Sequence, residues 1–360
     1  MTVRDSKVAI LQGIVATYRV PFFQLMAESY DITVFHSDEF DKHTSFGFKT
    51  VYLNKISIFN FNFQNFFKLY RAVKNFDSVV VMFDLRWICY VLLMVSPLRR
   101  KIILHGHRYS RNNLANKARN VLMRLTASSV LYGEEDFDEL KRHLDFKKIF
   151  VAPNTVKVDN SVDTSSYKKC SFLYIGRLQS RKNIDSLIKS FANIINEIPT
   201  EFKLNIIGDG EERKNLEKIA HQYNLKERVI FHGEIREPKL LLPLFSGALA
   251  SVHPDNIGLS VLHSFAYGIP VITKNQEAKS SEYRSGFRHG PEYYNIVDGE
   301  NGLLYSDIEN FESLLIRLAN KKIDGRRLGQ KAYEHFSKKR SLECMLLGFQ
   351  DAIKYQRNES

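Results

Sequence analysis

Short apolar runs alternate with segments of helical period along most of the chain. The runs Val8–Gln12, Ile32–His36, Val79–Phe83 and Lys101–Leu104 are almost continuously apolar, and turn residues or a polar residue follow each of them. Runs of this length are typical of strands buried on both faces of a parallel sheet, with helices between them. Residues 1–158 therefore predict a doubly wound, Rossmann-like α/β domain.

The same half contains one predicted helix with two interpretations. Val20–Tyr30 predicts the first helix, and Thr50–Phe59 predicts a third strand although its alternation is poor. Phe61–Phe76 predicts a helix that has phenylalanines on one side and lysine and arginine near the other. Such a helix either packs on the sheet or lies in a membrane interface, and the sequence leaves both interpretations open.

A polar, serine-rich connection, Asp159–Lys169, predicts a hinge between two domains. After it the alternation of strands and helices restarts, which predicts a second Rossmann-like domain over residues 170–340. Its predicted strands are Phe172–Ile175, Phe202–Ile207, Val229–Phe231 and Ala248–Val252. Its predicted helices are Leu187–Ile195, Glu211–Tyr223, Ile308–Leu318 and Gly325–Phe336, and a last amphipathic helix covers Leu342–Tyr355.

Two turns of the second half have the composition of an anion site. After Ala248–Val252, a polar loop reaches Gly258 before a helix predicted over Leu259–Tyr267. Such a loop presents backbone N–H groups and the positive end of a helix. After Phe172–Ile175 come a glycine and two cations, Arg177 and Lys182. A guanidinium fork and a mobile ammonium can together neutralise a leaving diphosphate.

These stretches resemble the nucleotide-sugar half of a family-4 glycosyltransferase, a retaining enzyme of the GT-B fold. The matching blocks cover roughly residues 170–310 and occur in the family's order. They are GRLQSRKNIDSLIKSF from Gly176, NIIGDGEERKNLEKIA from Asn205, VIFHGEI from Val229, NIGLSVLHSFAYGIPVIT from Asn256 and NIVDGENGLLY from Asn295. Several blocks in one order are more specific than a single glycine motif.

The resemblance implies a role for each matching position. Arg177 and Lys182 would hold the diphosphate, and Asp255 would bind hydroxyls of the donor sugar. The family usually has two glutamates eight positions apart here, and this chain has Asp255 and His263 instead. A neutral imidazole makes one hydrogen bond where a carboxylate binds two ribose hydroxyls. The backbone of the loop would complete the phosphate cradle through Asn256, Ile257, Gly258 and Leu259.

Further donor-binding positions follow from the same resemblance. Gly208 ends one strand close to the nucleotide, and Gly233 with Glu234 corresponds to the loop that recognises the base. Glu292 matches an acid that faces the sugar. Between Ile272 and Pro291 lies a longer basic loop, which is either a lid near the diphosphate or a disordered surface loop. Its basic residues are Lys274, Lys279, Arg284, Arg288 and His289.

The first half would bind the acceptor. Strands of a parallel sheet end at one edge, so Gly13, Asp84 and the turn from His105 to Arg108 are expected at one crevice. By resemblance, His107 first and His105 second would reach the donor sugar. The resemblance also implies that residues 341–360 cross back onto the first domain.

Charge points to the first half as the basic surface. The chain has 360 residues, 44% of them hydrophobic, and a formal net charge of +12. This length favours two domains. Residues 1–160 hold 23 Lys and Arg against 15 Asp and Glu, a balance of +8, and Leu85–Gly133 contains no acidic residue. Such a run is either a solvated face or an attraction to phosphate on a lipid-linked acceptor or an anionic membrane.

Other classes fit less well. The 3 cysteines have neither an even count nor metal spacing, the N-terminal apolar run is too short for a secretory signal, and no run is long enough to span a membrane. The cytoplasm, including the inner face of the membrane, is the expected location. No metal, other cofactor or nucleic acid is expected.

The sequence therefore predicts a retaining transferase that moves a sugar from a UDP- or GDP-activated donor. The acceptor would be a glycan or a polyprenyl-diphosphate-linked glycan in surface polysaccharide assembly. An inactive scaffold paralogue is the alternative that the Asp255 and His263 pair motivates. A sugar-nucleotide epimerase is a third interpretation, and it would need more acid and base groups than Asp84, His105 and His107 supply.

Overall fold

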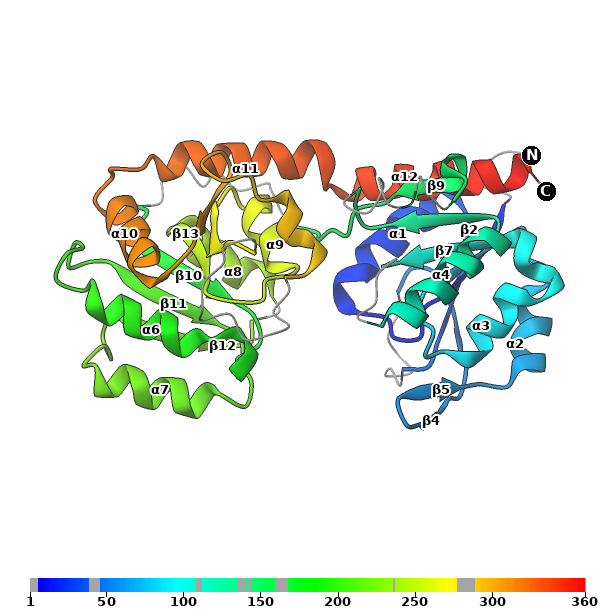
Figure 1. Ribbon diagram of the computed structural model, residues 1–360, viewed down its shortest axis with the longest axis horizontal. Coiled ribbons are helices and arrows are strands. Elements are labelled where there is room, and N and C mark those ends of the chain that lie inside the picture. The colour runs from blue at the N-terminus through cyan, green and yellow to red at the C-terminus, as the bar shows by residue number, and fades with distance from the viewer. Residues whose placement is uncertain are drawn as a thin grey trace. The chain divides into compact units, whose positions relative to one another are not determined.

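The chain forms two compact α/β units in a computed structural model. The structure describes residues 6–38, 46–107, 112–134, 140, 144–158, 168–235, 237–276 and 289–359. The first unit contains residues 1–157 together with 341–360, and the second contains residues 158–340 (Figure 1). Most of the predicted hinge and of the predicted basic lid, residues 159–167 and 277–288, lies outside the described residues.

The first unit is built on a parallel sheet of 7 strands in the order β3-β2-β1-β6-β7-β8-β9. Each run predicted as a strand from continuous apolar character is a strand, within two residues at either end. The strands are β1 Lys7–Leu11, β2 Asp31–His36, β3 Lys49–Tyr52, β6 Ser78–Met82, β7 Ile102–Gly106, β8 Ser128–Leu131 and β9 Ile149–Val151. Because all strands run the same way, their carboxyl ends share one edge.

Helices cover this sheet, and one of them comes from the end of the chain. They are α1 Val20–Ser29, α2 Phe66–Val73, α3 Ile88–Val95, α4 Asn113–Leu125 and α12 Leu342–Asn358. Phe349 of α12 packs against Phe22 of α1 with ring centroids 5.0 Å apart. The hydroxyl of Ser78 in β6 donates to Oε1 of Gln356, which fixes the register of α12 on the sheet.

The region between β3 and α2 differs from the prediction. The strand predicted over Thr50–Phe59 is two short strands, and the first residues of the helix predicted over Phe61–Phe76 form a third. β4 Ile56–Ile58 pairs antiparallel with β5 Phe61–Phe63, and Phe59 and Asn60 make the turn with positive φ. The helix begins only at Phe66, because the side chain of Asn65 accepts from the amide of Lys68 at 2.9 Å and caps it.

The second unit is built on a parallel sheet of 6 strands in the order β12-β11-β10-β13-β14-β15. Its predicted strands are confirmed, and β14 and β15 extend the sheet. The strands are β10 Ser171–Ile175, β11 Lys203–Ile207, β12 Val229–Gly233, β13 Ala248–His253, β14 Val271–Lys274 and β15 Gly302–Tyr305. The helices are α6 Ile184–Asn193, α7 Arg213–Gln222, α8 Pro238–Ser246, α9 Ser260–Ala266, α10 Ile308–Ala319 and α11 Gly325–Lys339.

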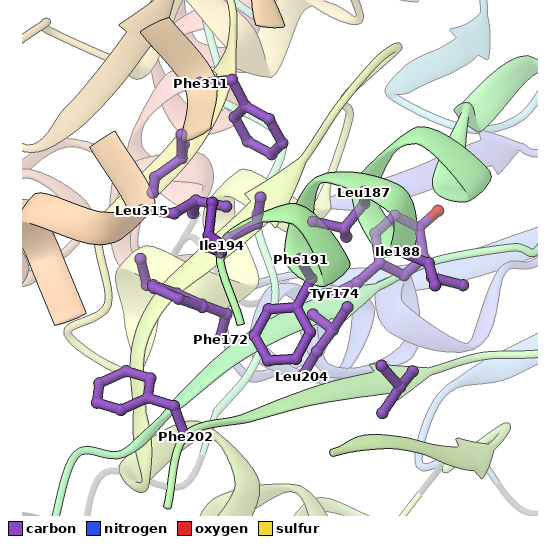
Figure 2. Close-up of a cluster of buried hydrophobic side chains, with 14 of the residues drawn as sticks. Phe172, Tyr174, Leu187, Ile188, Phe191, Ile194, Phe202, Leu204, Phe311 and Leu315 are labelled. Carbon is purple, nitrogen blue, oxygen red and sulfur yellow. The ribbon is translucent and has the colours of Figure 1, made fainter. Parts of the chain in front are cut away.

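An apolar core holds the strands of the second unit in place. Figure 2 shows Phe172 and Tyr174 of β10 together with Phe191 of α6 and Phe311 of α10, and all four side chains are at most 1% exposed. Burying one such side chain contributes about 1.5–3 kcal/mol. The core therefore fixes the ends of β10 and its neighbours, from which the polar turns of the next subsection emerge.

Candidate functional site

Two glycines bring the turns after β10 and β11 into backbone contact. A Cβ on Gly208 would lie 1.9 Å from the carbonyl oxygen of Gly176, and a Cβ on Gly210 would lie 2.3 Å from that of Leu178. The amide of Leu178 donates to the carbonyl of Asp209 at 2.9 Å across this contact. Only glycine fits such an approach, so the turn that carries Arg177 starts from a fixed position.

The segment from Arg177 to Lys182 presents cations at this edge. The Tyr174 hydroxyl donates to the carbonyl of Arg177 at 3.1 Å, and the side chain of Arg177 is exposed. A short helix, η5 Ser180–Lys182, then leads to Asn183, which has a left-handed φ of 53° and starts α6. The helix predicted over Leu187–Ile195 thus begins three residues earlier, at Ile184.

Lys182 and Arg181 both reach the polar loop after β13. Nζ of Lys182 donates to the carbonyl oxygen of Asn256 and, at 3.2 Å, to its Oδ1. Nη1 of Arg181 donates to the same Oδ1 at 3.0 Å. Burial, with help from Arg181 and Arg177, lowers the pKa of Lys182 to about 8, although Asp255 opposes the shift. The ammonium is still charged at neutral pH, and its partners in the loop are neutral oxygens.

A histidine whose role the sequence analysis missed holds the loop in place. The amide of Ile257 donates to Nδ1 of His289 at 3.1 Å, and Nε2 of His289 donates to the carbonyl of Lys274 at 2.8 Å. These bonds fix the neutral tautomer, and burial lowers the pKa of His289 to about 4. The two residues are far apart in sequence, so no local pattern signals this contact.

The same bond corrects one predicted role. The amide of Ile257 was expected to bind phosphate, but His289 already accepts from it. The structure gives no acceptor within its described part for the amides of Gly258 and Leu259. Those two amides are therefore the positions of the loop that can bind an incoming oxygen.

A buried carboxylate lies beside the loop. Glu292, in the short helix η6 Pro291–Asn295, is 7% exposed. A Cβ on Gly290 would lie 2.8 Å from its Oε2, and one on Gly258 would lie 3.9 Å from it. The amide of Gly290 donates to the carbonyl of Ile257 at 2.7 Å. The structure thus brings Glu292 together with the 255–259 loop.

The remaining predicted donor residues of the second unit lie on neighbouring elements. His263 is on α9, burial lowers its pKa to about 4, and its Nδ1 has no partner among the described residues. Asp255 accepts from the amide of Asn256 at 3.1 Å. Gly233 has a φ of 72° and its carbonyl accepts from the amide of Gly208 at 2.8 Å, whereas Glu234 is exposed.

A second histidine, His253 at the end of β13, was also missed. It is 3% exposed, and its Nε2 lies 2.8 Å from Oγ of Ser251. Burial, with Lys182 and His289 nearby, lowers its pKa to about 3. The histidine is neutral at physiological pH and adds no charge beside Lys182.

The first unit places its predicted residues at its own strand-end edge. Gly13 follows β1, and a Cβ there would lie 2.0 Å from the ring of Trp87, which gives this glycine a packing role. Nη2 of Arg86 donates to Oδ2 of Asp84 at 2.6 Å. Burial alone would raise the pKa of Asp84. The hydrogen bonds and the positive charge of Arg86 together have the larger effect, so the pKa lies below its usual value. Asp84 is therefore a charged, paired carboxylate and not a proton donor.

The two predicted histidines of the first unit differ in exposure. His105 is inside β7 and 4% exposed, and burial together with Arg19 and His107 keeps its pKa well below the usual range. His107 is exposed, and its carbonyl accepts from Nη1 of Arg119 at 2.7 Å. Both imidazole rings pack edge-on against Tyr132, at 5.1 and 4.7 Å.

The described residues lack a metal-binding cluster and a membrane-spanning helix. They contain no group of three His, Cys, Asp or Glu side chains placed to hold a metal ion. None of their helices combines the length and the apolar character that crossing a membrane requires.

Comparison with known proteins gives a family for the second unit. The family described as "Glycosyl transferases group 1" matches residues 161–335. The match covers most of the second unit and just under half of the chain, so the second unit is similar to glycosyltransferases of group 1.

Two curated relatives are similar at a distance. The poly(glycerol-phosphate) alpha-glucosyltransferase of Bacillus subtilis is 25% identical over 243 residues, which are 64% of this chain and 34% of the relative. A Campylobacter jejuni alpha-1,4-N-acetyl-D-galactosaminyltransferase, named for an undecaprenol-linked acceptor, is 26% identical over 72% of this chain and 68% of its own. The chain spans 34% and 48% of the first two curated relatives it matches.

Solved structures share the fold over nearly the whole chain. The Anabaena HepE structure in complex with UDP has a TM-score of 0.71 and 13% identity, and the match covers 97% of this chain and 100% of that one. The two Rossmann-like units of this chain thus have the GT-B fold seen in such glycosyltransferase structures.

Proposed function

We propose that this chain, whose second unit is similar to glycosyltransferases of group 1, is a retaining glycosyltransferase. It moves a sugar from a UDP- or GDP-activated donor to a glycan or a polyprenyl-diphosphate-linked glycan in surface polysaccharide assembly. The observation that carries the proposal is the convergence of Lys182 and Arg181 on Asn256, beside the exposed Arg177. Relatives named as glycosyltransferases of cell-surface polymers support the same activity.

Neutral partners suit these cations to a diphosphate. Lys182 is bound by a carbonyl and an amide oxygen, which a phosphate oxygen can replace at an energetic gain because it is charged. The incoming charge favours the protonated ammonium, so the pKa of Lys182 rises from about 8 when the nucleotide binds. The amides of Gly258 and Leu259 supply further donors.

In the proposed reaction the bond between the anomeric carbon and the phosphate oxygen breaks first. Its electron pair stays on the departing nucleoside diphosphate, where Arg177 and Lys182 stabilise the developing charge. The acceptor hydroxyl forms the new bond on the same face, and its proton passes to a phosphate oxygen. Configuration is retained because bond breaking and bond making use one face. The protein contributes mainly position and charge.

Side chains around the loop orient the donor. Asp255 binds sugar hydroxyls, and Glu292 lies beside the loop, near Gly258. His263 offers the ribose one hydrogen bond from a neutral ring, since its pKa is about 4. His107 is exposed at the edge of the first unit, and we assign it to the donor sugar, with His105 behind it.

We propose that the reaction needs no metal, because two cations can neutralise the diphosphate. Transfer should therefore survive EDTA, and a loss restored by Mg²⁺ or Mn²⁺ would refute this part. We also propose that the protein works at the cytoplasmic face of an anionic membrane, to which the acid-free stretch Leu85–Gly133 is attracted.

The decisive experiment is transfer or hydrolysis from a panel of UDP- and GDP-sugars, with Arg177→Ala and Lys182→Ala as comparisons. Turnover with one donor that both variants reduce supports the proposal. Nucleotide binding without turnover of any donor would favour the scaffold alternative, which the Asp255 and His263 pair motivates. An isomerised sugar nucleotide formed without acceptor would show an epimerase.

A further inference from the structure

Two buried arginines lie at the strand-end edge of the first unit without an ion pair to any described carboxylate. Arg19, at the start of α1, is 6% exposed. Its Nη2 donates to the hydroxyl of Tyr132 and its Nε to that of Tyr18 at 3.3 Å, while Nη1 is buried with no partner in the described chain. Arg119 is 8% exposed, and its Nε also has no partner there.

In its described surroundings the charge of Arg19 meets no carboxylate, only the hydroxyls and rings of Tyr18 and Tyr132. A guanidinium keeps its proton, so burial without an anion is unfavourable. Arg19 also occupies the N-cap of α1, a helix of 10 residues whose positive end repels a cation. The neighbouring stretch Leu85–Gly133, which contains Arg119, has no acidic residue. Among the described residues, therefore, no carboxylate balances the charge of Arg19 at this edge; the acidic residues within 135–139, which follow Tyr132 in the chain, lie outside the described part.

Hydrogen-bond donors gather around the same point. His105 is 4% exposed, and its Nε2 has no partner among the described residues. The ring of Tyr132 lies 5.1 Å from that of His105, and Cζ of Arg19 lies 5.5 Å from it. Arg19 and Tyr132 follow β1 and β8, and His105 lies inside β7 next to its last residue; the carboxyl ends of these three strands share one edge of the sheet.

We propose that Arg19, His105 and Tyr132 form a binding site for a phosphate group of the sugar acceptor. A phosphate supplies a negative charge to pair with the guanidinium of Arg19. It also has several oxygens, which suits a guanidinium fork next to an imidazole. A neutral glycan would leave the guanidinium uncompensated. This site rests on the proposed transferase function and names the chemical class of its acceptor.

The test uses the full chain with inorganic phosphate, geranyl phosphate and, as the uncharged control, geraniol. Melting temperature is followed against probe concentration, because ligand binding to the native state raises it. Geranyl phosphate should stabilise the wild type and Lys182→Ala alike. In Arg19→Gln the apparent dissociation constant for geranyl phosphate should rise at least about tenfold, and Arg19→Lys should show an intermediate rise. UDP should stabilise Arg19→Gln as it does the wild type.

The outcomes separate this site from the transferase proposal. An undiminished phosphate response in Arg19→Gln, or its loss in Lys182→Ala, would overturn the site. If inorganic phosphate stabilises the protein as much as geranyl phosphate does, and this effect still requires Arg19, the proposed site is supported, since phosphate itself is then recognised. If Arg19→Gln does not fold, His105→Gln and Tyr132→Phe take its place. A failure of the transferase proposal appears separately, as absence of turnover with every nucleotide sugar.

A different observation concerns the β4–β5 hairpin and the start of α2. Six large apolar side chains there form what we call the hairpin patch, and Figure 1 shows the hairpin at the edge of the first unit beside α2 and α3. Its members and their exposed fractions are Ile56 64%, Ile58 50%, Phe59 91%, Phe61 45%, Phe63 38% and Phe67 73%.

The tip of the hairpin is unfavourable for folding. Phe59 has a φ of 46° and Asn60 a φ of 69°. The left-handed conformation is tolerated by asparagine but disfavoured for a bulky aromatic residue. Phe59 also has the largest exposed fraction of any large hydrophobic residue in the described chain. Neither backbone conformation nor burial explains a phenylalanine at this position.

The charge around the hairpin patch is of one sign. Residues 42–76 contain no Asp or Glu. Lys68 and Arg71 of α2 and Lys74 at its C-cap are exposed. Lys55 lies over the ring of Trp87, 5.6 Å from its centroid. Exposed aromatic residues flanked by cations fit the interface of an anionic bilayer.

We infer that the hairpin patch inserts into the interface of an anionic membrane. Co-sedimentation should show binding to vesicles of phosphatidylcholine with phosphatidylglycerol and much weaker binding to phosphatidylcholine alone. Phe59→Asn should lower the partition coefficient about tenfold, since one buried aromatic side chain is lost, without lowering the melting temperature. The matched control is Leu347→Asn, on α12 and 58% exposed, which should bind as the wild type does.

The chain has 1 tryptophan, and its fluorescence can report the contact between the hairpin patch and the membrane. Trp87 is 4% exposed and sits beneath the hairpin, where the amide of Asn62 donates to the carbonyl of Arg86 at 2.7 Å. Brominated lipids should therefore quench its fluorescence, and less so in Phe59→Asn. Equal vesicle binding by Phe59→Asn and the control Leu347→Asn would overturn the inference. So would a dimer in solution that Phe59→Asn dissociates, because a second copy would then be the partner of the patch.

Discussion

The strand-end edges of the two units hold their positive charges in different ways. In the second unit, Arg177 and Arg181 are exposed and Lys182 is bound by neutral oxygens of Asn256. In the first unit, Arg19 and Arg119 are buried. Solvated cations cost little when no ligand is bound, whereas buried ones favour a bound anion. The second edge therefore suits a diphosphate that binds and leaves in each cycle.

The largest expected effect comes from breaking the second edge at its backbone. Gly208→Ala places a Cβ 1.9 Å from the carbonyl oxygen of Gly176, at a φ of 135°. We expect a loss of about 4 kcal/mol in the free energy of unfolding, from overpacking and from the backbone conformation. Urea denaturation measures it.

Gly299→Ala is the matched control, since Gly299 has a φ of 72° but no atom within 4 Å of its Cβ position. It should cost about 1 kcal/mol. Equal losses in the two variants would mean that the close approach of the two turns is not what constrains this edge.

The next effect tests the cation that contacts the loop. Lys182→Ala should lower kcat/KM about 10²–10³-fold, because the charge of the departing diphosphate is no longer neutralised there. Steady-state transfer kinetics measure it. Lys189→Ala removes an exposed cation that pairs with Asp185 at 3.0 Å and should leave kcat/KM unchanged. A similar loss in both variants would argue for a general charge effect.

A pH titration sharpens the same point. The pKa of Lys182 is about 8 in the free protein, and diphosphate binding favours its charged form. UDP affinity should therefore be constant from about pH 7 to 8 and fall by up to about tenfold per pH unit above that. Calorimetric titration of UDP measures the profile. Lys182→Arg should extend the plateau, and an unchanged profile in that variant would assign the titration to another group.

The smallest expected effect concerns the ribose contact. His263→Glu restores a carboxylate that can accept from two hydroxyls, so UDP should bind about 1 kcal/mol more tightly. The dissociation constant of UDP measures it, with His263→Gln as the control that offers no charge. Weaker binding in the Glu variant would show that the neutral ring at this position is the better partner.

Sequence patterns predicted the two sheets because their strands are short, apolar and buried on both faces. They failed at the hairpin, where Phe61 and Phe63 also fit the helical period of the residues after them. The dipeptide Phe59-Asn60 is not a usual turn signal, so the reversal was missed. Asn65, as the N-cap of α2, was the one local mark of the true helix start.

For the site, the sequence predicted which turns carry polar residues but not which atoms are already used. The cations and the loop from Asp255 to Leu259 could be chosen from local composition. The bond from Ile257 to His289 joins residues 32 positions apart, and which described residues lie beside Arg19 depends on the fold. Both are tertiary properties, which periodicity and spacing do not encode.

The helix α12 has a consequence for biosynthesis. It supplies Phe349, Ala352 and Ile353 to the core of the first unit, yet it follows the whole second unit in the chain. On the ribosome, residues 158–340 are therefore complete and able to fold while the earlier unit still lacks its closing helix. The part of the chain that is synthesised first should be the last to become protease-resistant.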